Sequence, residues 1–190
     1  MHRIEAYITF ALLLLTAITL LALPIFFLLR KRKGISILRQ FACLFWGVSL
    51  GLILFATIFF VWPITFRPEY RFLNLVPFDW LRLANPVHMF MIEVVPNILF
   101  FIPLGLFTPI VFSKMRSWAK TFLFVFLVTF GVETIQFCIG RTADIDDILA
   151  NFLGGVIGFL LFAFLHRLCK NSKIWRRLIG TKPVDESSTI

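Results

Sequence analysis

Long apolar runs separated by short charged segments are the main pattern of this chain. Five stretches stay apolar over about 20 residues, which is the length that an α-helix needs to cross the roughly 30 Å of hydrocarbon in a bilayer. The pattern predicts an all-α membrane protein with five transmembrane helices. The predicted helices occupy residues 8–29, 44–62, 94–112, 121–140 and 148–165.

The composition excludes a soluble protein. Of the 190 residues, 59% are hydrophobic and 15% are charged, a composition that soluble globular domains do not have. The formal net charge is +9, but basic residues next to so much Phe and Leu indicate loops at anionic lipid. We therefore expect membrane lipids as partners and no nucleic acid.

The basic residues also predict the orientation in the membrane. With five helices, fourteen of the 19 Lys and Arg residues fall on one side and five on the other. Positively charged flanks stay on the cytoplasmic side during insertion, so we expect the N-terminus outside and the C-terminus in the cytoplasm. The positive charge follows the first apolar stretch instead of preceding it, which argues against a cleaved signal peptide.

Small residues on the last apolar stretch predict close helix packing. Gly154 and Gly158 are four residues apart, with Gly155 beside them, and such spacing lets helix backbones approach closely in lipid. We expect the last helix to lie in the middle of the bundle. A homodimer contact, and therefore a homo-oligomer, is the alternative interpretation of the same spacing.

Three prolines interrupt the third predicted helix. Each of them removes a backbone donor, so the helix should bend or open locally. The irregular helix either borders a polar cavity or only shapes the packing, and the sequence leaves both interpretations open. The prolines are Pro96, Pro103 and Pro109.

An acid and an amide stand within the fourth predicted helix. Glu133 and Gln136 are three residues apart and so share one face of a segment that is otherwise apolar. An acidic group costs about 2.5 to 3.5 kcal/mol at the centre of a transmembrane helix and less towards its end. The pair is therefore a candidate for function, with a hydrogen-bonded structural role as the alternative.

The segment GRTADIDDILAN follows directly. Asp144, Asp147 and Asn151 are spaced to share one stripe of the last helix, whereas Asp146 should point elsewhere, towards water. Arg141 supplies a balancing cation. A simpler interpretation makes Asp144 an N-cap and places Asp147 at the positive helix end.

Asn97 lies near the start of the third predicted helix. Three predicted helices thus bring polar side chains towards the same membrane surface. If they meet, they form an outward-facing polar site with apolar walls. Its candidate catalytic residues are Glu133, Arg141 and Asp147, and its candidate substrate-binding residues are Asn97, Gln136, Asp144 and Asn151.

Motifs for metal or cofactor chemistry are not found in the sequence. The chain has no HExxH, no GxSxG and no metal-spaced histidine cluster, and its three cysteines form no CxxC. We expect no metal and no cofactor. Hydrolysis would therefore depend on carboxylates and water alone.

Several strings of the chain resemble the VanZ-like family, named for a teicoplanin-resistance protein of Gram-positive bacteria. The strings are NLVPF (74–78), PNILFFIPLG (96–105) and GVETIQFCIGRTADIDDILANFLGGVIG (131–158). The resemblance implies a bacterial plasma-membrane protein that is associated with tolerance of lipoglycopeptide antibiotics. It implies no chemical mechanism.

This resemblance suggests a division of the chain into three regions. Residues 1–73 form an N-terminal two-span region without a matching motif, and residues 74–165 form a VanZ-like three-span region. Residues 166–190 form a basic cytoplasmic tail, in which Trp175 and Ile179 suit an amphipathic helix on the inner leaflet.

The predicted site allows several functions. An enzyme would use Glu133 or Asp147 as general acid or base and Arg141 to hold phosphate. A non-catalytic binder would hold a lipid-linked cell-wall precursor or a lipoglycopeptide in the same pocket. A structural or drug-excluding envelope protein is the further alternative, and a proton-coupled carrier is the least favoured.

Overall fold

The protein is described by a computed structural model that places residues 36–59 and 72–181. The predicted first helix, residues 8–29, lies outside the described residues. The elements in chain order are α2 (Ile37–Phe59), β1 (Leu73–Asn74), the 3-10 turn η2 (Asp79–Arg82), α3 (Pro86–Met89), the π-helical turn η3 (Phe90–Val94), α4 (Val95–Val111), the 3-10 turn η4 (Ser113–Met115), α5 (Trp118–Cys138), β2 (Ala143–Asp144), α6 (Ile145–Cys169) and α7 (Lys173–Ile179).

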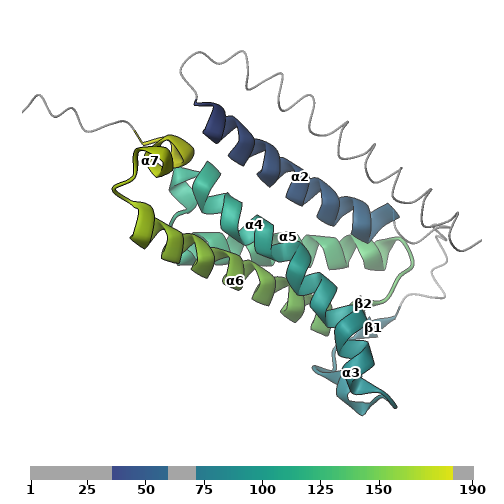
Figure 1. The fold of residues 1–190 in the computed structure, drawn as a ribbon. Helices are drawn as coiled ribbons and strands as arrows, with labels where there is room; N and C mark the ends of the chain where they lie inside the picture. The colour runs from purple at the N-terminus through teal and green to yellow at the C-terminus, as the bar shows by residue number, and fades with distance from the viewer. Residues whose placement is uncertain (1–35, 60–71, 182–190) are drawn as a thin grey trace, which may run out of the picture.

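Four of the described helices are long and apolar enough to cross a membrane. They confirm the predicted helices at 44–62, 94–112, 121–140 and 148–165, in a fold that is mostly helical. All four begin earlier than predicted, by seven or eight residues at Ile37 and Pro86 and by three residues at Trp118 and Ile145. The helices lie side by side, with α7 at one end and α3 and both strands at the other (Figure 1).

The backbones of α4 and α6 are in direct contact. A Cβ atom added to Gly105 would lie 2.1 Å from the carbonyl oxygen of Gly155, and one added to Gly158 would lie 2.1 Å from that of Ile102. No side chain fits at such a distance, so only glycine allows this approach. The prediction of close packing through Gly154 and Gly158 is confirmed, since Gly154 meets Ile98 in the same way.

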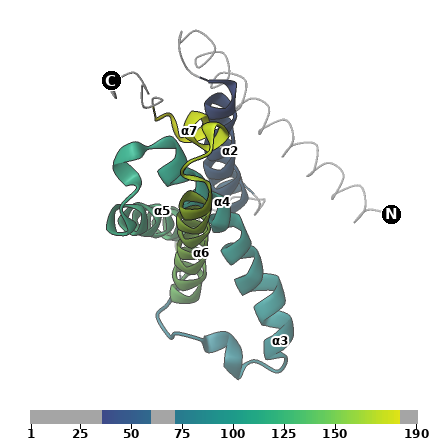
Figure 2. The same cartoon turned by 60° about the vertical axis from the view of Figure 1, so that its left-hand side comes forward.

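The middle of the bundle is occupied by α4. It contacts α2, α5 and α6, whereas the main helix contacts of α6 are with α4 and α5 (Figure 2). Among the described helices, the prediction that the last one lies in the middle was therefore wrong. The glycines of α6 allow very close contact with one helix, α4. Such a contact does not require α6 to have many neighbouring helices.

A π-helical turn marks the first of the three prolines. The amide of Val95 donates to Phe90, five residues earlier, directly before Pro96. The local opening that the prolines predicted is therefore at η3, while α4 runs on through Pro103 and Pro109. Beyond η3, α3 diverges from the end of α6 (Figure 2).

The short helix α7 folds back on the bundle. Trp175 and Ile179 are buried in a core cluster with residues of α2, α4 and α6. The Arg116 guanidinium donates to the Ile179 carbonyl at 2.7 Å, and burial together with the charge of Arg39 lowers the pKa of Arg116. Trp175 and Ile179 of the tail helix thus pack in protein, whereas Ile174 is 67% exposed, and the expectation that this helix lies on the inner leaflet stays a prediction.

The contact between α4 and α6 leads to a first prediction. Gly158→Ala should lower the free energy of unfolding by about 2 kcal/mol or more, because the new methyl group would overlap the Ile102 backbone. Gly131→Ala is the control, since nothing lies within 4 Å of a Cβ at that position. Unfolding of both variants in mixed detergent micelles measures the difference, and equal stabilities would contradict the proposed contact.

Candidate ligand-binding site

The turn between α5 and α6 gathers polar groups at the α3 end of the bundle. Gly140 has a φ of 88°, a left-handed conformation that suits glycine and lets the chain leave α5 abruptly. The strand β2 then pairs in parallel with β1, with Leu73 opposite Ala143 and Asn74 opposite Asp144. This pairing brings the segment after residue 74 next to the acids of α6.

Glu133 stabilises this turn through the hydrogen bonds of its carboxylate. Its side chain is only 4% exposed, and Oε2 accepts the backbone N–H of Asp144 at 3.1 Å. The Gln136 amide, in the orientation that satisfies its surroundings, donates to Oε1 at 2.9 Å and to Oε2 at 3.1 Å. In the same orientation its oxygen accepts from Arg141 Nη1 at 2.9 Å. The carboxylate therefore has partners within the protein for both of its oxygens.

Asp147 links the last helix to α4. Its Oδ1 accepts from Asn97 Nδ2 at 2.6 Å, across the interface where the glycines bring the two helices together. Both side chains are half-buried. The predicted convergence of Asn97 and Asp147 is thus present as a direct hydrogen bond.

Asp144 caps the last helix, as the simpler interpretation proposed. Oδ1 accepts the N–H of Asp146 at 2.8 Å, which is an N-cap bond at the start of α6. Oδ2 accepts from Asn74 Nδ2 at 3.0 Å. One carboxylate therefore caps the helix and holds the β1 loop.

Asp146 has a role that sequence reasoning missed. Its carboxylate accepts two consecutive backbone N–H groups, from Phe78 at 2.7 Å and from Asp79 at 3.1 Å. The sequence predicted that this side chain points into water. An acid in the first turn of a helix is already explained by the helix dipole, so its position alone does not indicate a further contact. The available signal was that NLVPF and the segment with Asp146 both belong to the strings that resemble the family.

Asn151 lies deeper in the bundle, between α5 and α6. It is 3% exposed, and its Nδ2 donates to Thr129 Oγ1 at 3.0 Å. Its Oδ1 has no hydrogen-bond partner among the residues that the structure describes. This amide does not line the cavity described next.

A cavity of about 560 Å³ opens between the bundle and the α5–α6 turn. Five of the seven predicted site residues line it, namely Asn97, Gln136, Arg141, Asp144 and Asp147. Glu133 and Asn151 are not among the lining residues. The remaining lining residues are Ile53, Ile92, Glu93, Pro96, Phe100, Phe101, Gly140 and Thr142.

The cavity combines two chemical surfaces. Acids and amides line it near the α5–α6 turn, whereas Phe100 and Phe101, one turn further along α4 from Asn97, give it an apolar wall with Ile53 of α2. The lining carries three carboxylates, from Glu93, Asp144 and Asp147, against one guanidinium, from Arg141. Within the part of the chain that is described, no group of three His, Cys, Asp or Glu residues could hold a metal ion.

Comparison with known proteins assigns the chain to a family. A family model described as VanZ/LLP1 matches residues 8–166. The chain belongs to the VanZ/LLP1 family. It is 30% identical over 144 residues to "Protein VanZ" of Enterococcus faecium, an alignment that covers 70% of this chain and 84% of that protein. No solved structure matches the chain.

The family assignment agrees with the resemblance seen in the sequence and extends it. The match begins at residue 8 and so includes the region before residue 74, where no motif was found. Together with the four apolar helices, membership in the VanZ/LLP1 family identifies a multi-pass membrane protein. The three strings that carry the resemblance contribute Asn97, Gln136, Arg141, Asp144 and Asp147 to the cavity.

The contacts of Glu133 lead to a second prediction. Glu133→Ala should speed hydrogen exchange of the α5–α6 turn about tenfold or more, because the half-buried Asp144 N–H loses its acceptor and an unsatisfied donor costs about 1 to 3 kcal/mol. Glu93→Ala is the control, since Glu93 lines the same cavity with an exposed side chain. Exchange of peptides from residues 139–147 in lipid nanodiscs measures the effect. Equal exchange in the two variants would show that Glu133 does not support the turn.

Proposed function

We propose that this VanZ/LLP1 family protein binds an amphiphilic, lipid-linked component of the bacterial cell envelope. One observation carries the proposal: the cavity is polar beside Asp147 and apolar beside Phe100. An amphiphile would place its headgroup at the polar part and its hydrocarbon chain along the apolar wall. A cavity of about 560 Å³ is within the range of roughly 300 to 1,000 Å³ that is usual for small-molecule sites.

The charge of the lining favours a headgroup with ammonium or hydroxyl groups. Three carboxylates face one guanidinium, and the Gln136 amide already accepts a hydrogen bond from that guanidinium. A bare phosphate would be repelled by the acids, whereas an ammonium group would be attracted and sugar hydroxyls could donate to them. The expectation that Arg141 holds phosphate is therefore less favoured than binding of such a headgroup.

Binding of this kind offers a link to antibiotic tolerance. The family resemblance implies tolerance of teicoplanin and related lipoglycopeptides, and the Enterococcus faecium relative is named Protein VanZ. A lipid-linked cell-wall precursor and a lipoglycopeptide are both amphiphiles. Sequestering either of them in the plasma membrane would reduce the encounter between drug and target.

The hydrogen bonds of Glu133 favour a binder over an enzyme. A general acid or base must reach the atom it protonates or deprotonates, but Glu133 is buried beneath Gln136 and bonds the Asp144 backbone. Glu133 therefore suits a structural role. Asp147 and Arg141 line the cavity and are the groups that a ligand would touch.

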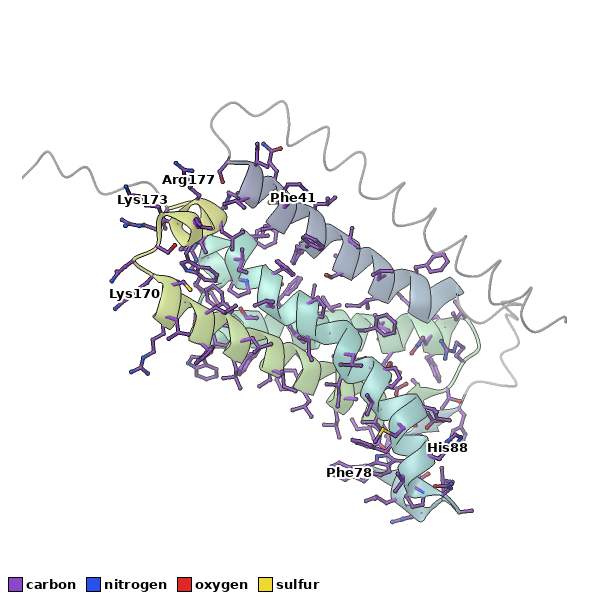
Figure 3. All side chains as sticks on the ribbon, in the orientation of Figure 1. Phe41, Phe78, His88, Lys170, Lys173 and Arg177 are labelled. Carbon is purple, nitrogen blue, oxygen red and sulfur yellow. The ribbon has the colours of Figure 1, made fainter. Side chains whose placement is uncertain are left out.

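We infer that the cavity faces the outside of the cell and the C-terminus faces the cytoplasm. The basic side chains of Lys170, Lys173 and Arg177 lie at the α7 end, opposite His88 and Phe78 at the α3 end (Figure 3). Positive flanks stay in the cytoplasm, which supports an outward-facing cavity.

A binding experiment tests the proposed function. Protein purified in mild detergent should retain an amphiphile that native mass spectrometry detects, and Asp147→Asn should retain less than about one tenth of it, a loss of about 1.4 kcal/mol. Asp79→Asn is the matched control, because it makes the same change at the same end of the bundle but outside this cavity. In cells, Asp147→Asn should abolish any teicoplanin tolerance that the wild-type protein confers. Equal retention in wild type and Asp147→Asn would exclude the cavity as the site.

A labelling experiment tests the orientation. In a background without native cysteines, Thr142→Cys should react with a membrane-impermeant maleimide on intact cells, and Lys173→Cys should react only after permeabilisation. Both side chains are exposed and lie at opposite ends of the bundle. The reverse pattern of labelling would invert the topology.

A further inference from the structure

The segment between β1 and η3 exposes a series of apolar side chains. The segment consists of a loop, η2 and α3 and lies beyond the end of α6 (Figures 1 and 2). Phe78 is 55% exposed and Val87 is 69% exposed. The series consists of Leu75, Val76, Phe78, Leu81, Leu83 and Val87. Contiguous apolar surface of this kind usually marks a site of contact with protein or membrane.

Exposed apolar side chains also occur where this segment joins α4. Met91 and Ile92, in η3, and then Leu99, on α4, are exposed, with the acidic Glu93 between them. The helix from Pro86 to Val111 has 26 residues and a length of about 39 Å, which exceeds the roughly 30 Å of the hydrocarbon core. Its first turns must therefore tilt or lie in the headgroup layer, and they do diverge sideways from α6 (Figure 2).

The backbone at Phe78 is held in an unusual conformation. Its φ is 60°, in the left-handed region, and it is the one residue other than glycine with a positive φ in the described ranges. A bulky residue keeps this conformation only where its surroundings impose it. The surroundings here are the Asp146 carboxylate, which accepts the N–H groups of Phe78 and Asp79.

Hydrogen bonds of Asn74 hold the other end of the same loop. Asn74 Oδ1 accepts the N–H of Val76 at 3.1 Å, and Asn74 Nδ2 donates to Asp144 at 3.0 Å. Asp144, the N-cap of α6, and Asp146, in its first turn, thus hold both ends of a loop whose apolar side chains are exposed. These hydrogen bonds keep Leu75 and Phe78 exposed. Such side chains are more stable next to an apolar environment than in water.

We propose that residues 72–91 form an interfacial anchor, which lies in the headgroup region of one leaflet with its apolar side chains in lipid, and that Asp146 is a positioning residue that holds Phe78 there. Lipid is favoured as the occupant because the chain of this segment runs directly into a helix of membrane-spanning length, Pro86–Val111, whose own apolar side chains are also exposed. The anchor does not depend on the ligand of the cavity. It would place the cavity mouth at the level of the lipid headgroups, where an amphiphile could enter from the leaflet.

Spin-label accessibility tests the anchor. In cysteine-free protein in nanodiscs of phosphatidylglycerol and phosphatidylcholine, nitroxides at Leu81→Cys and Val76→Cys should collide with oxygen more than with a water-soluble nickel chelate. Lys173→Cys, exposed at the α7 end, serves as the aqueous reference, and Leu127→Cys, exposed on α5, serves as the lipid reference. Values equal to those of Lys173→Cys would overturn the anchor. Protection from both reagents would overturn it too, since it would indicate a second copy or another protein on this surface.

The role of Asp146 is tested in the Leu81→Cys background, which keeps Phe78. Asp146→Ala should raise the collision rate of the nitroxide at position 81 with the nickel chelate at least twofold. The nitroxides at positions 127 and 173, each in its own single-cysteine protein, should give unchanged collision rates. An unchanged reading at position 81 would overturn the positioning role. Asp146→Asn keeps one acceptor oxygen and should give an intermediate reading. A general loss of folding would instead shift the readings at all three labelled positions.

Discussion

The site depends on the contact between the backbones of α4 and α6. Glycines at 105, 154 and 158 remove the side chains that would otherwise separate the two helices. Only at this separation can Asn97 reach Asp147, since a hydrogen bond of 2.6 Å cannot be made across an interface filled by larger side chains. Apolar packing in lipid lacks the hydrophobic drive that operates in water, so close backbone contact and interhelical hydrogen bonds together hold this pair.

The polar residues at the α3 end separate into two groups with different tasks. Glu133 and Asn151 are buried and bonded to protein, and they connect α5 to the beginning and to the middle of α6. Asp147 and Arg141 line the cavity, where a ligand could reach them. The cost of placing polar groups in a membrane is offset in the first group by internal hydrogen bonds, and in the second by access to the cavity.

The three acids at the start of α6, Asp144, Asp146 and Asp147, have three different roles. Asp144 caps the helix, Asp146 fastens the loop before η2, and Asp147 bonds α4. Successive positions on a helix point about 100° apart, so neighbouring acids must face different partners. The motif therefore joins the α5–α6 turn, the β1 loop and α4 beside the cavity.

The sequence alone determined the features that depend on local pattern. Apolar run length predicted the four described helices of membrane-spanning length, glycine spacing predicted the close packing of α6, and the alternation of loops predicted that Asn97, Glu133 and Asp147 lie at the same end of the helices, as they do. Tertiary structure alone decided that Glu133 is sealed beneath Gln136, that Asp146 holds Phe78, and that α7 packs on the bundle. The physical reason is that the length and face of a helix follow from neighbours along the chain, whereas a hydrogen-bond partner follows from distances between distant segments, which only packing sets.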